Sequence, residues 1–236
     1  SFEIADEYKR ERPCLRKGRE GAPSLDACIF NQKPPTWAVV GDSHSNEFAL
    51  SLSSKLPNEG VHQFSMSACS PSLLFRKKDE SCHSFSTYTI EHIISSKSIK
   101  NVVLVYRHSL YLKGDFAIDV SYKPKSNVHI QPLTSKNTVK ETNVVNTYKK
   151  SFYKMINKLL KAGKNVYITT PIPELKDDIK RFQTPVTIFN ANPKGDIYHA
   201  VNLDTYQKRQ SWWFEVEAGI PDRAFIISAW DNLCGK

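Results

Sequence analysis

Residues 101–106, Asn-Val-Val-Leu-Val-Tyr, form an apolar run that is rich in β-branched residues and shows no alternation of polar and apolar positions. A strand with this pattern is buried on both faces, as strands are in parallel sheets that carry helices on each side. The chain is therefore predicted to build its core around such a sheet.

Similar short runs alternate with stretches of helical spacing along most of the chain. The predicted strands are 36–41, 61–66, 101–106, 166–170 and 224–228, and the predicted helices between them are 48–56, 84–97, 141–165 and 203–220. Strands that alternate with helices predict an α/β domain whose parallel sheet is covered on both faces.

The first 35 residues do not follow this alternation, since they are charged and irregular and contain four prolines. We interpret residues 1–35 as an N-terminal extension packed on an α/β domain that occupies residues 36–236. Residues 107–140 are polar and are predicted to leave the sheet in a long excursion.

The chain carries a formal net charge of +9, which suggests an acidic environment such as anionic lipid headgroups or a polysaccharide. The lysines are scattered and no nucleic-acid-binding motif accompanies them, so most are interpreted as solvated surface and no nucleic-acid partner is expected. No apolar run approaches the length of roughly 18 residues that a membrane-spanning helix needs, and no apolar signal segment opens the sequence.

Five cysteines, at positions 14, 28, 69, 82 and 234, have neither a CxxC spacing nor a zinc-ligand spacing, so no metal site is expected. Their proximity suggests disulfides between Cys14 and Cys28 and between Cys69 and Cys82, which implies an oxidising compartment. The alternative is five reduced, buried cysteines in a cytosolic protein. Cys234 is left over, and its partner is expected beyond Lys236.

Ser43 follows the predicted strand 36–41 and precedes a helix, so it lies at the carboxyl edge of the sheet, where ligands bind in open α/β folds. A serine there can serve as an acyl-transfer nucleophile, because the helix N–H groups can stabilise a developing negative charge. The alternative is that Asp42 and Ser43 only cap the helix. The residue types alone leave both interpretations open.

Residues 41–44 read Gly-Asp-Ser-His, and four further short motifs follow the later predicted strands in order. These are Cys69-Ser70-Pro71, Arg107, the stretch 171–174 and Leu233-Cys234. In these motifs the chain resembles, from about residue 36 to the end, the SGNH hydrolase superfamily, in particular the SGNH domains fused to the membrane bundle of acyltransferase family 3 proteins.

The resemblance implies a three-layer α/β/α sandwich of flavodoxin-like type in the bacterial periplasm, near the membrane surface, as part of an inner-membrane protein. Such a domain helps to transfer an acetyl or other acyl group to a surface glycan such as lipopolysaccharide O-antigen, without a cofactor. Its partners are the glycan acceptor and the fused transmembrane acyltransferase domain. Ser43 would take the acyl group as an ester, and a sugar hydroxyl would then attack that ester.

The resemblance also implies where the oxyanion and substrate-binding groups lie. They are the backbone of Ser67 and Ala68, the side chain of Arg107, and the neighbours of the nucleophile, Asp42 and His44. The family usually has a glycine after the second strand and an asparagine after the third, whereas the corresponding places here read Ser-Met-Ser-Ala-Cys (65–69) and Tyr-Arg-His-Ser (106–109). Arg107 would replace the amide donor or bind an anionic substrate, and the alternative is a surface arginine in a salt bridge.

Family enzymes carry their aspartate and histidine, spaced Asp-x-x-His, on a loop beyond the last strand. No such pair follows residues 224–228, so the domain is predicted to lack its C-terminal catalytic loop and to be impaired as a catalyst. His44, His108 and His199 are the histidines considered as replacement bases.

The leading hypothesis is therefore a periplasmic serine-dependent O-acetyltransferase or esterase domain. The alternatives are a non-catalytic domain that binds or positions the glycan acceptor and a free-standing carbohydrate esterase. A downstream Asp-x-x-His pair favours the enzyme, and a signal peptide upstream in place of membrane helices favours the free-standing esterase.

Overall fold

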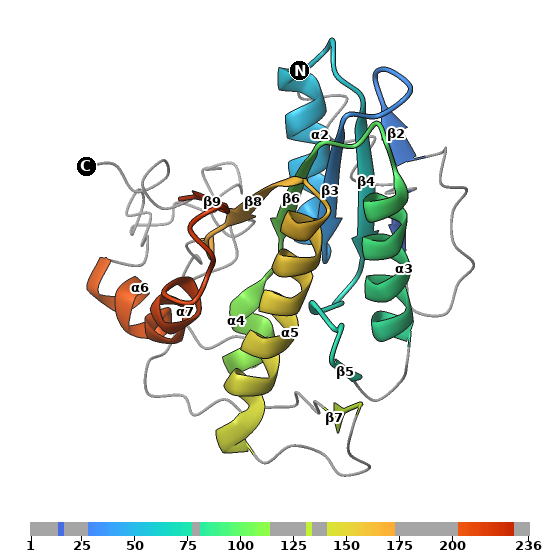
Figure 1. Ribbon diagram of the computed structural model, residues 1–236. Coiled ribbons are helices and arrows are strands. Elements are labelled where there is room, and N and C mark those ends of the chain that lie inside the picture. The colour runs from blue at the N-terminus through green and yellow to red at the C-terminus, as the bar shows by residue number, and fades with distance from the viewer. Residues whose placement is uncertain are drawn as a thin grey trace, which may run out of the picture.

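The computed structural model describes residues 14–16, 28–76, 81–113, 131–133, 141–172 and 203–228, and its centre is one mostly parallel sheet (Figure 1). The order of the strands is β1-β4-β3-β6-β8-β9, and β2 also pairs with β4. These strands are β1 (Leu15–Arg16), β2 (Ile29–Phe30), β3 (Trp37–Gly41), β4 (Val61–Met66), β6 (Asn101–Val105), β8 (Asn165–Thr169) and β9 (Phe225–Ile227). The pairs from β4 to β9 are all parallel, which confirms the predicted sheet.

The helices follow the strands as the alternation predicted, with one difference near the end. They are α2 (His44–Lys55), α3 (Ser81–Ser95), α4 (His108–Lys113), α5 (Glu141–Lys161), α6 (Leu203–Arg209) and α7 (Ser211–Glu217). The predicted helix 203–220 is two helices, because Gln210, with φ −96° and ψ 10°, leaves the helical conformation. Within the excursion 107–140 lie α4 and β7 (Gln131–Pro132), which pairs antiparallel with β5 (Phe75–Arg76).

Two apolar clusters lie on opposite faces of the sheet and produce three layers. On one face, Val39 and Val103 pack with Ala49 of α2. On the other face, their strand neighbours Val40 and Leu104 join a larger cluster with α3, α5 and α7, and α3 and α5 lie side by side there (Figure 1). The β-branched run of β6 is thus buried on both faces, and the three-layer α/β/α sandwich is confirmed.

Parts of the N-terminal 35 residues join the sheet at its β4 edge. β1 pairs with β4 in parallel, with Leu15 opposite Ser65, and β2 pairs antiparallel with the other half of β4, with Ile29 opposite His62. The two short strands therefore follow one another along the same edge of β4.

The predicted disulfide between Cys14 and Cys28 is not formed in the structure, where both residues are reduced thiols. Each precedes one of the two edge strands, so the strand registers bring both side chains against the middle of β4. The buried thiols contact each other through a hydrogen bond, which lowers the pKa of Cys14 and, with burial, raises the pKa of Cys28. In the described residues, main-chain pairing with β4 holds these edge strands in place of a covalent bond.

The second predicted disulfide is confirmed, because Cys69 and Cys82 are bonded, with Cα atoms 5.3 Å apart. The bond joins the loop after β4 to the first turn of α3. It therefore holds one of the loops at the carboxyl edge of the sheet against a helix of the core.

Replacing Cys69 and Cys82 together by alanine should lower the free energy of unfolding by about 3 kcal/mol, because closing a loop of this length restricts the unfolded chain. Urea denaturation of the double variant measures the effect, and reduced wild-type protein serves as the control. Equal stability of oxidised and reduced wild-type protein would contradict this role.

Gly41 ends β3 at a point where no side chain fits. A Cβ atom there would lie 1.7 Å from the backbone oxygen of Val105, which is its partner on β6. Because the obstacle is backbone in the centre of the sheet, it cannot rotate away. Gly41 thus allows β3 and β6 to approach closely just before the turn that carries Asp42 and Ser43.

Gly41→Ala should destabilise the protein by about 3 kcal/mol, because the strands must separate to admit the methyl group. Gly163→Ala is the comparison, since Gly163 has open space around it and only its φ of +73° disfavours a side chain. That strain costs about 1 kcal/mol. A smaller loss for Gly41→Ala than for Gly163→Ala in chemical denaturation would contradict the close approach.

Candidate active site

Ser43 occupies the turn between β3 and α2, at the N-cap position of the helix. Its side chain makes no capping hydrogen bond, and the residue is only partly buried. The neighbouring Asp42 accepts the His44 N–H instead, at 2.9 Å through Oδ1. The capping role predicted for Asp42 and Ser43 thus belongs to Asp42 alone. The Ser43 hydroxyl remains uncommitted.

The first N–H groups of α2 are mostly used within the turn itself. Ser45 N–H donates to the Asp42 carbonyl oxygen at 3.1 Å, and Asn46 N–H donates to the Ser43 carbonyl oxygen at 3.4 Å. The Ser43 N–H donates to no other residue in the described part of the chain. It is thus the amide available to an oxyanion at this end of the helix, where the helix dipole also favours negative charge.

The Asp42 carboxylate joins two loops at the carboxyl edge of the sheet. Besides the contact with His44, its Oδ2 accepts the Arg107 N–H at 2.7 Å and the Tyr111 hydroxyl at 2.8 Å. Arg107 follows β6 and Tyr111 lies on α4, so the carboxylate fixes the nucleophile turn against the β6–α4 segment.

The ionised form of Asp42 is favoured although the residue is only 1% exposed. Burial raises the pKa of this carboxyl, but the His44 ring, whose Nδ1 lies 3.2 Å from Oδ1, and the N–H groups of His44 and Arg107 together lower it below its ordinary value. Asp42 is therefore a charged anchor at neutral pH.

Asp42→Asn should lower the free energy of unfolding by about 2–3 kcal/mol at pH 7, because hydrogen bonds to a charged acceptor are lost. The native pKa is depressed, so the stability that Asp42 contributes is present at neutral pH and is lost as the pH falls below about 4. Urea denaturation from pH 7 to pH 3 should show the wild type and Asp42→Asn converging.

Tyr111→Phe is the matched comparison, since it removes one donor and keeps the carboxylate. A loss of about 1–2 kcal/mol is expected. Equal stability of the wild type and Asp42→Asn at pH 7 would rule out the anchoring role.

Arg107 lies beside the nucleophile turn, as predicted, and is partly buried. Because Asp42 already accepts its N–H, the group that Arg107 could offer to a substrate is the guanidinium. Ser67 and Ala68 follow β4, whose Ser65 is in register with Gly41, so their loop begins beside the nucleophile turn.

The expected oxyanion donors after β4 need one correction. The Ser67 N–H donates to the Arg16 carbonyl oxygen at 2.8 Å, so it serves the pairing of the edge strand. Ala68 has a φ of 52°, the left-handed conformation that favours glycine. Ala68 adopts this conformation despite its side chain.

His108 is a core residue and not a general base. It is 0% exposed, its Nδ1 lies 2.5 Å from the Tyr148 hydroxyl, and its ring packs against Trp213. Burial lowers the pKa of His108 to about 3, so the ring is neutral.

His199 lies outside the described residues. It does, however, form an Asp-x-x-His sequence with Asp196, and this pair precedes the last strand instead of following it. The spacing alone could have indicated this pair at the level of the sequence.

The structure also contains a buried polar chain that the sequence interpretation missed. Gln63 donates to Asn46 Oδ1 and to Ser65 Oγ, both at 2.9 Å, and Ser65 Oγ lies 2.5 Å from Ser45 Oγ. Gln63 and Ser65 occupy alternate positions of β4 and face α2. Two polar residues at alternate positions, and so on one face of a buried strand, were the available signal. The chain fixes the first turn of α2 directly after the nucleophile.

Fold and site together define a class of protein: three-layer α/β domains that present a serine at the carboxyl edge of a parallel sheet. The family model described as SGNH domain (fused to AT3 domains) matches residues 13–236, so the chain belongs to this family of SGNH domains. The resemblance is thereby confirmed, and the match begins within the segment interpreted as an extension. No curated protein matches the chain.

The chain is thus an SGNH hydrolase-type domain associated with acyltransferase proteins, and the fusion to AT3 domains makes it a domain of a membrane protein. Among the helices that the structure describes, none has the length and apolar character required to cross a membrane.

Proposed function

We propose that the domain serves a serine-dependent O-acyltransferase, which transfers an acetyl group to a cell-surface glycan such as lipopolysaccharide O-antigen in the bacterial periplasm. The observation that carries this proposal is the state of Ser43. Its hydroxyl makes no capping bond and its N–H donates to no described residue, while Asp42 holds the surrounding turn.

The reaction needs two acyl transfers at Ser43. Its Oγ attacks the acetyl carbonyl of the donor, the hydroxyl proton passes to a base, and the donor leaves with a proton. A sugar hydroxyl then attacks the acetyl ester on Ser43, and the proton it loses returns to Ser43 Oγ by way of the base. The Ser43 N–H and the Arg107 guanidinium are the proposed groups that stabilise the oxyanion in both steps.

As the base, the buried and neutral His108 is excluded because it cannot reach a substrate. His44 stays a candidate, since a carboxylate beside a ring Nδ1 is also what orients the histidine of a Ser-His-Asp triad. The family places its histidine beyond the last strand, whereas the Asp196 and His199 pair lies before it. If the whole protein carries no further Asp-x-x-His pair and neither His44 nor His199 acts, a non-catalytic glycan-positioning domain becomes the better function.

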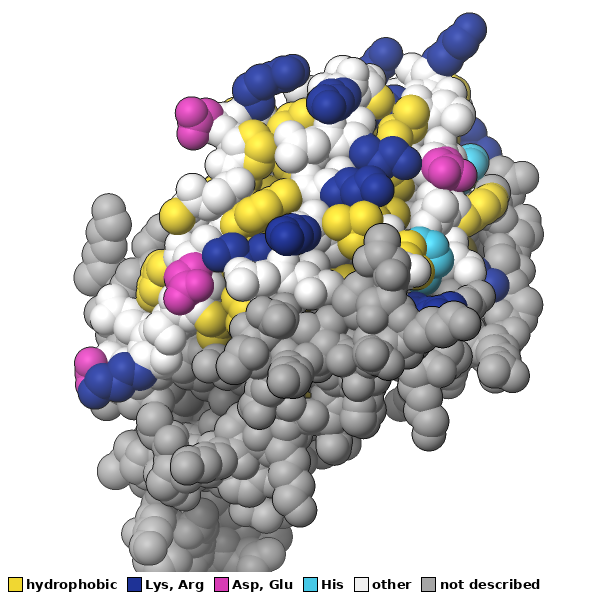
Figure 2. Space-filling view, turned by 60° about the horizontal axis from the view of Figure 1, so that its bottom comes forward, with side chains coloured by type: hydrophobic (Ala, Val, Ile, Leu, Met, Phe, Trp, Pro, Cys, Tyr) yellow, Lys and Arg dark blue, Asp and Glu magenta, His cyan; other side chains and the backbone are white. Residues whose placement is uncertain are grey.

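The charge of the surface supports an anionic partner such as membrane headgroups or an acidic glycan. Figure 2 shows Lys and Arg side chains spread over the face that α5 and α3 form. Helix α5 alone contributes five lysines, and one of them, Lys149, has an acidic neighbour, Glu215, at 3.8 Å. The lysines contributed by α5 are Lys149, Lys150, Lys154, Lys158 and Lys161.

Ser43→Ala in the full-length protein should reduce turnover of p-nitrophenyl acetate by at least about 10³-fold, because the proposed mechanism forms its acetyl ester on the Ser43 hydroxyl. Release of nitrophenol measures turnover. Ser51→Ala is the matched control, since Ser51 lies on the exposed side of α2 and should leave turnover unchanged.

Equal turnover by the wild type and Ser43→Ala would remove Ser43 from the mechanism. In the same assay, loss of turnover in His199→Ala would assign the base to His199. Unchanged turnover in that variant would place the base elsewhere in the protein.

A further inference from the structure

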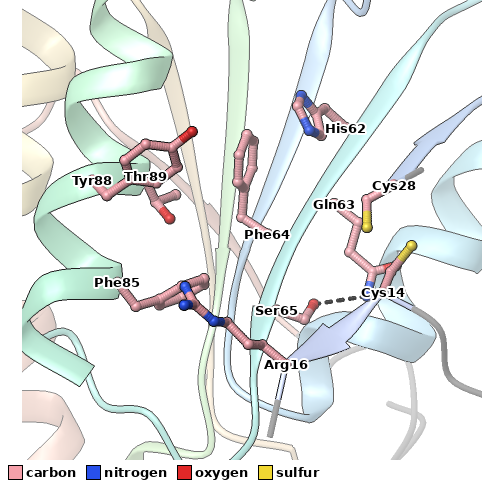
Figure 3. A pocket seen from close by; sticks show the side chains of 10 residues that line it. All are labelled: Cys14, Arg16, Cys28, His62, Gln63, Phe64, Ser65, Phe85, Tyr88 and Thr89. Carbon is pink, nitrogen blue, oxygen red and sulfur yellow. Dashed lines mark hydrogen bonds between the residues drawn. The ribbon is translucent and has the colours of Figure 1, made fainter. Parts of the chain in front are cut away.

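A recess lies beside β4, between α3 and the two N-terminal strands that pair with β4 (Figure 3). Its volume is about 40 Å³. Phe85, Tyr88 and Thr89 extend from α3 toward Phe64 of β4, and the Arg16 side chain extends from β1 toward Phe85. The wall of this pocket is mostly carbon.

The strand registers place the pocket close to the nucleophile turn. Arg16 is opposite Met66 on β4, and Ser65 is opposite Gly41 on β3. Neighbouring strands lie roughly 4.8 Å apart, so β1 is about 10 Å from β3 at the level of the nucleophile turn. When one sugar of a glycan is bound at Ser43, a neighbouring sugar of the same glycan could therefore reach this pocket.

The Thr89 hydroxyl is the chemical signal within the pocket. Thr89 is 0% exposed, and its Oγ1 has no hydrogen-bond partner among the residues that the structure describes. A buried hydroxyl without a partner is unfavourable, so such groups in proteins are usually satisfied by a water or a ligand. Thr89 thus offers one hydrogen bond to a group that fits closely against this wall, which also carries the side chains of Arg16 and Gln63.

The size and chemistry of the pocket select a small group with one acceptor and an apolar end. A water needs about 10–15 Å³ of such volume, so the pocket admits roughly three waters or a group of three to four heavy atoms. An acetyl group on a sugar has this size: its carbonyl oxygen can accept from Thr89, and its methyl can pack between Phe64 and Phe85. Tyr88, 47% exposed at the mouth, offers a ring face to the sugar itself.

We propose that this pocket binds the acetyl group of an acetylated sugar in the acceptor glycan, carried either as an acetamide or as an acetate ester. The proposal rests on the proposed function, because it assumes that the domain binds a glycan. It adds a specificity site for a sugar that already bears an acetyl group.

Saturation-transfer NMR with the full-length protein tests the proposal, on the Ser43→Ala background so that no ester is turned over. The probes are the methyl glycosides of N-acetylglucosamine, 6-O-acetylglucose and glucose. At least one acetylated glycoside should bind, with the strongest saturation on its acetyl methyl, and plain methyl glucoside should bind at least tenfold more weakly. The two acetylated probes distinguish the amide from the ester.

Three threonine variants separate the Thr89 hydroxyl from the fold of α3. Thr89→Val should weaken binding of the acetylated glycoside about tenfold, because one buried hydrogen bond is lost. Thr89→Ser should retain the binding, and Thr87→Val, the same change on the same helix outside the pocket, should have no effect. Thermal unfolding checks that each variant folds, and Thr89→Val should be at least as stable as its parent.

Equal binding of the three glycosides, no binding of any, or wild-type binding by Thr89→Val would overturn the proposal and leave only water in the pocket. These outcomes are independent of ester turnover by protein with an intact Ser43. The experiment can therefore reject acetyl binding in the pocket without rejecting the proposed function, and the reverse.

Discussion

The Asp42 carboxylate is the interaction on which the candidate site depends. It is buried, ionised and bonded to groups from two successive β–α connections, the turn after β3 and the segment after β6. A buried carboxylate is stable only when such donors surround it. By capping the turn, Asp42 leaves the Ser43 hydroxyl uncommitted, and by holding the Arg107 backbone it places that side chain beside the nucleophile.

The close approach of β3 and β6 makes this arrangement possible. Gly41 lets β3 and β6 approach each other without a side chain between them. Asp42, the next residue, can then accept the N–H of Arg107, which follows β6. On the other side of β3, the polar chain through Ser65 and Gln63 fixes the first turn of α2. The nucleophile turn is therefore held from both neighbouring strands, which suits a site that must not reorganise during acyl transfer.

The N-terminal strands β1 and β2 pair with β4 at the edge of the sheet. An edge strand with unpaired N–H and C=O groups is a liability, and β1 and β2 cover this one in two short pieces. Between them and α3 lies the pocket with Thr89. The interpretation of residues 1–35 as an extension on the domain contained no hint of this pairing, because two-residue strands have no periodicity to detect. The reduced thiols of Cys14 and Cys28 are a second example, since proximity in the sequence could indicate contact between them but not a covalent bond.

The sequence by itself determined the parallel sheet, its helical layers, the family and the position of Ser43, because these depend on local patterns of apolar residues and on short motifs. It also indicated the Cys69–Cys82 bond. Only the tertiary structure decided that Asp42 and not Ser43 caps the turn, that Tyr111 donates to Asp42, that the Ser67 N–H is used by Arg16, and that His108 is buried. Each of these depends on which groups from distant segments come into contact. The hydrogen-bond partner and the burial of a side chain follow from such contacts, and the residues next to it in the sequence do not determine them.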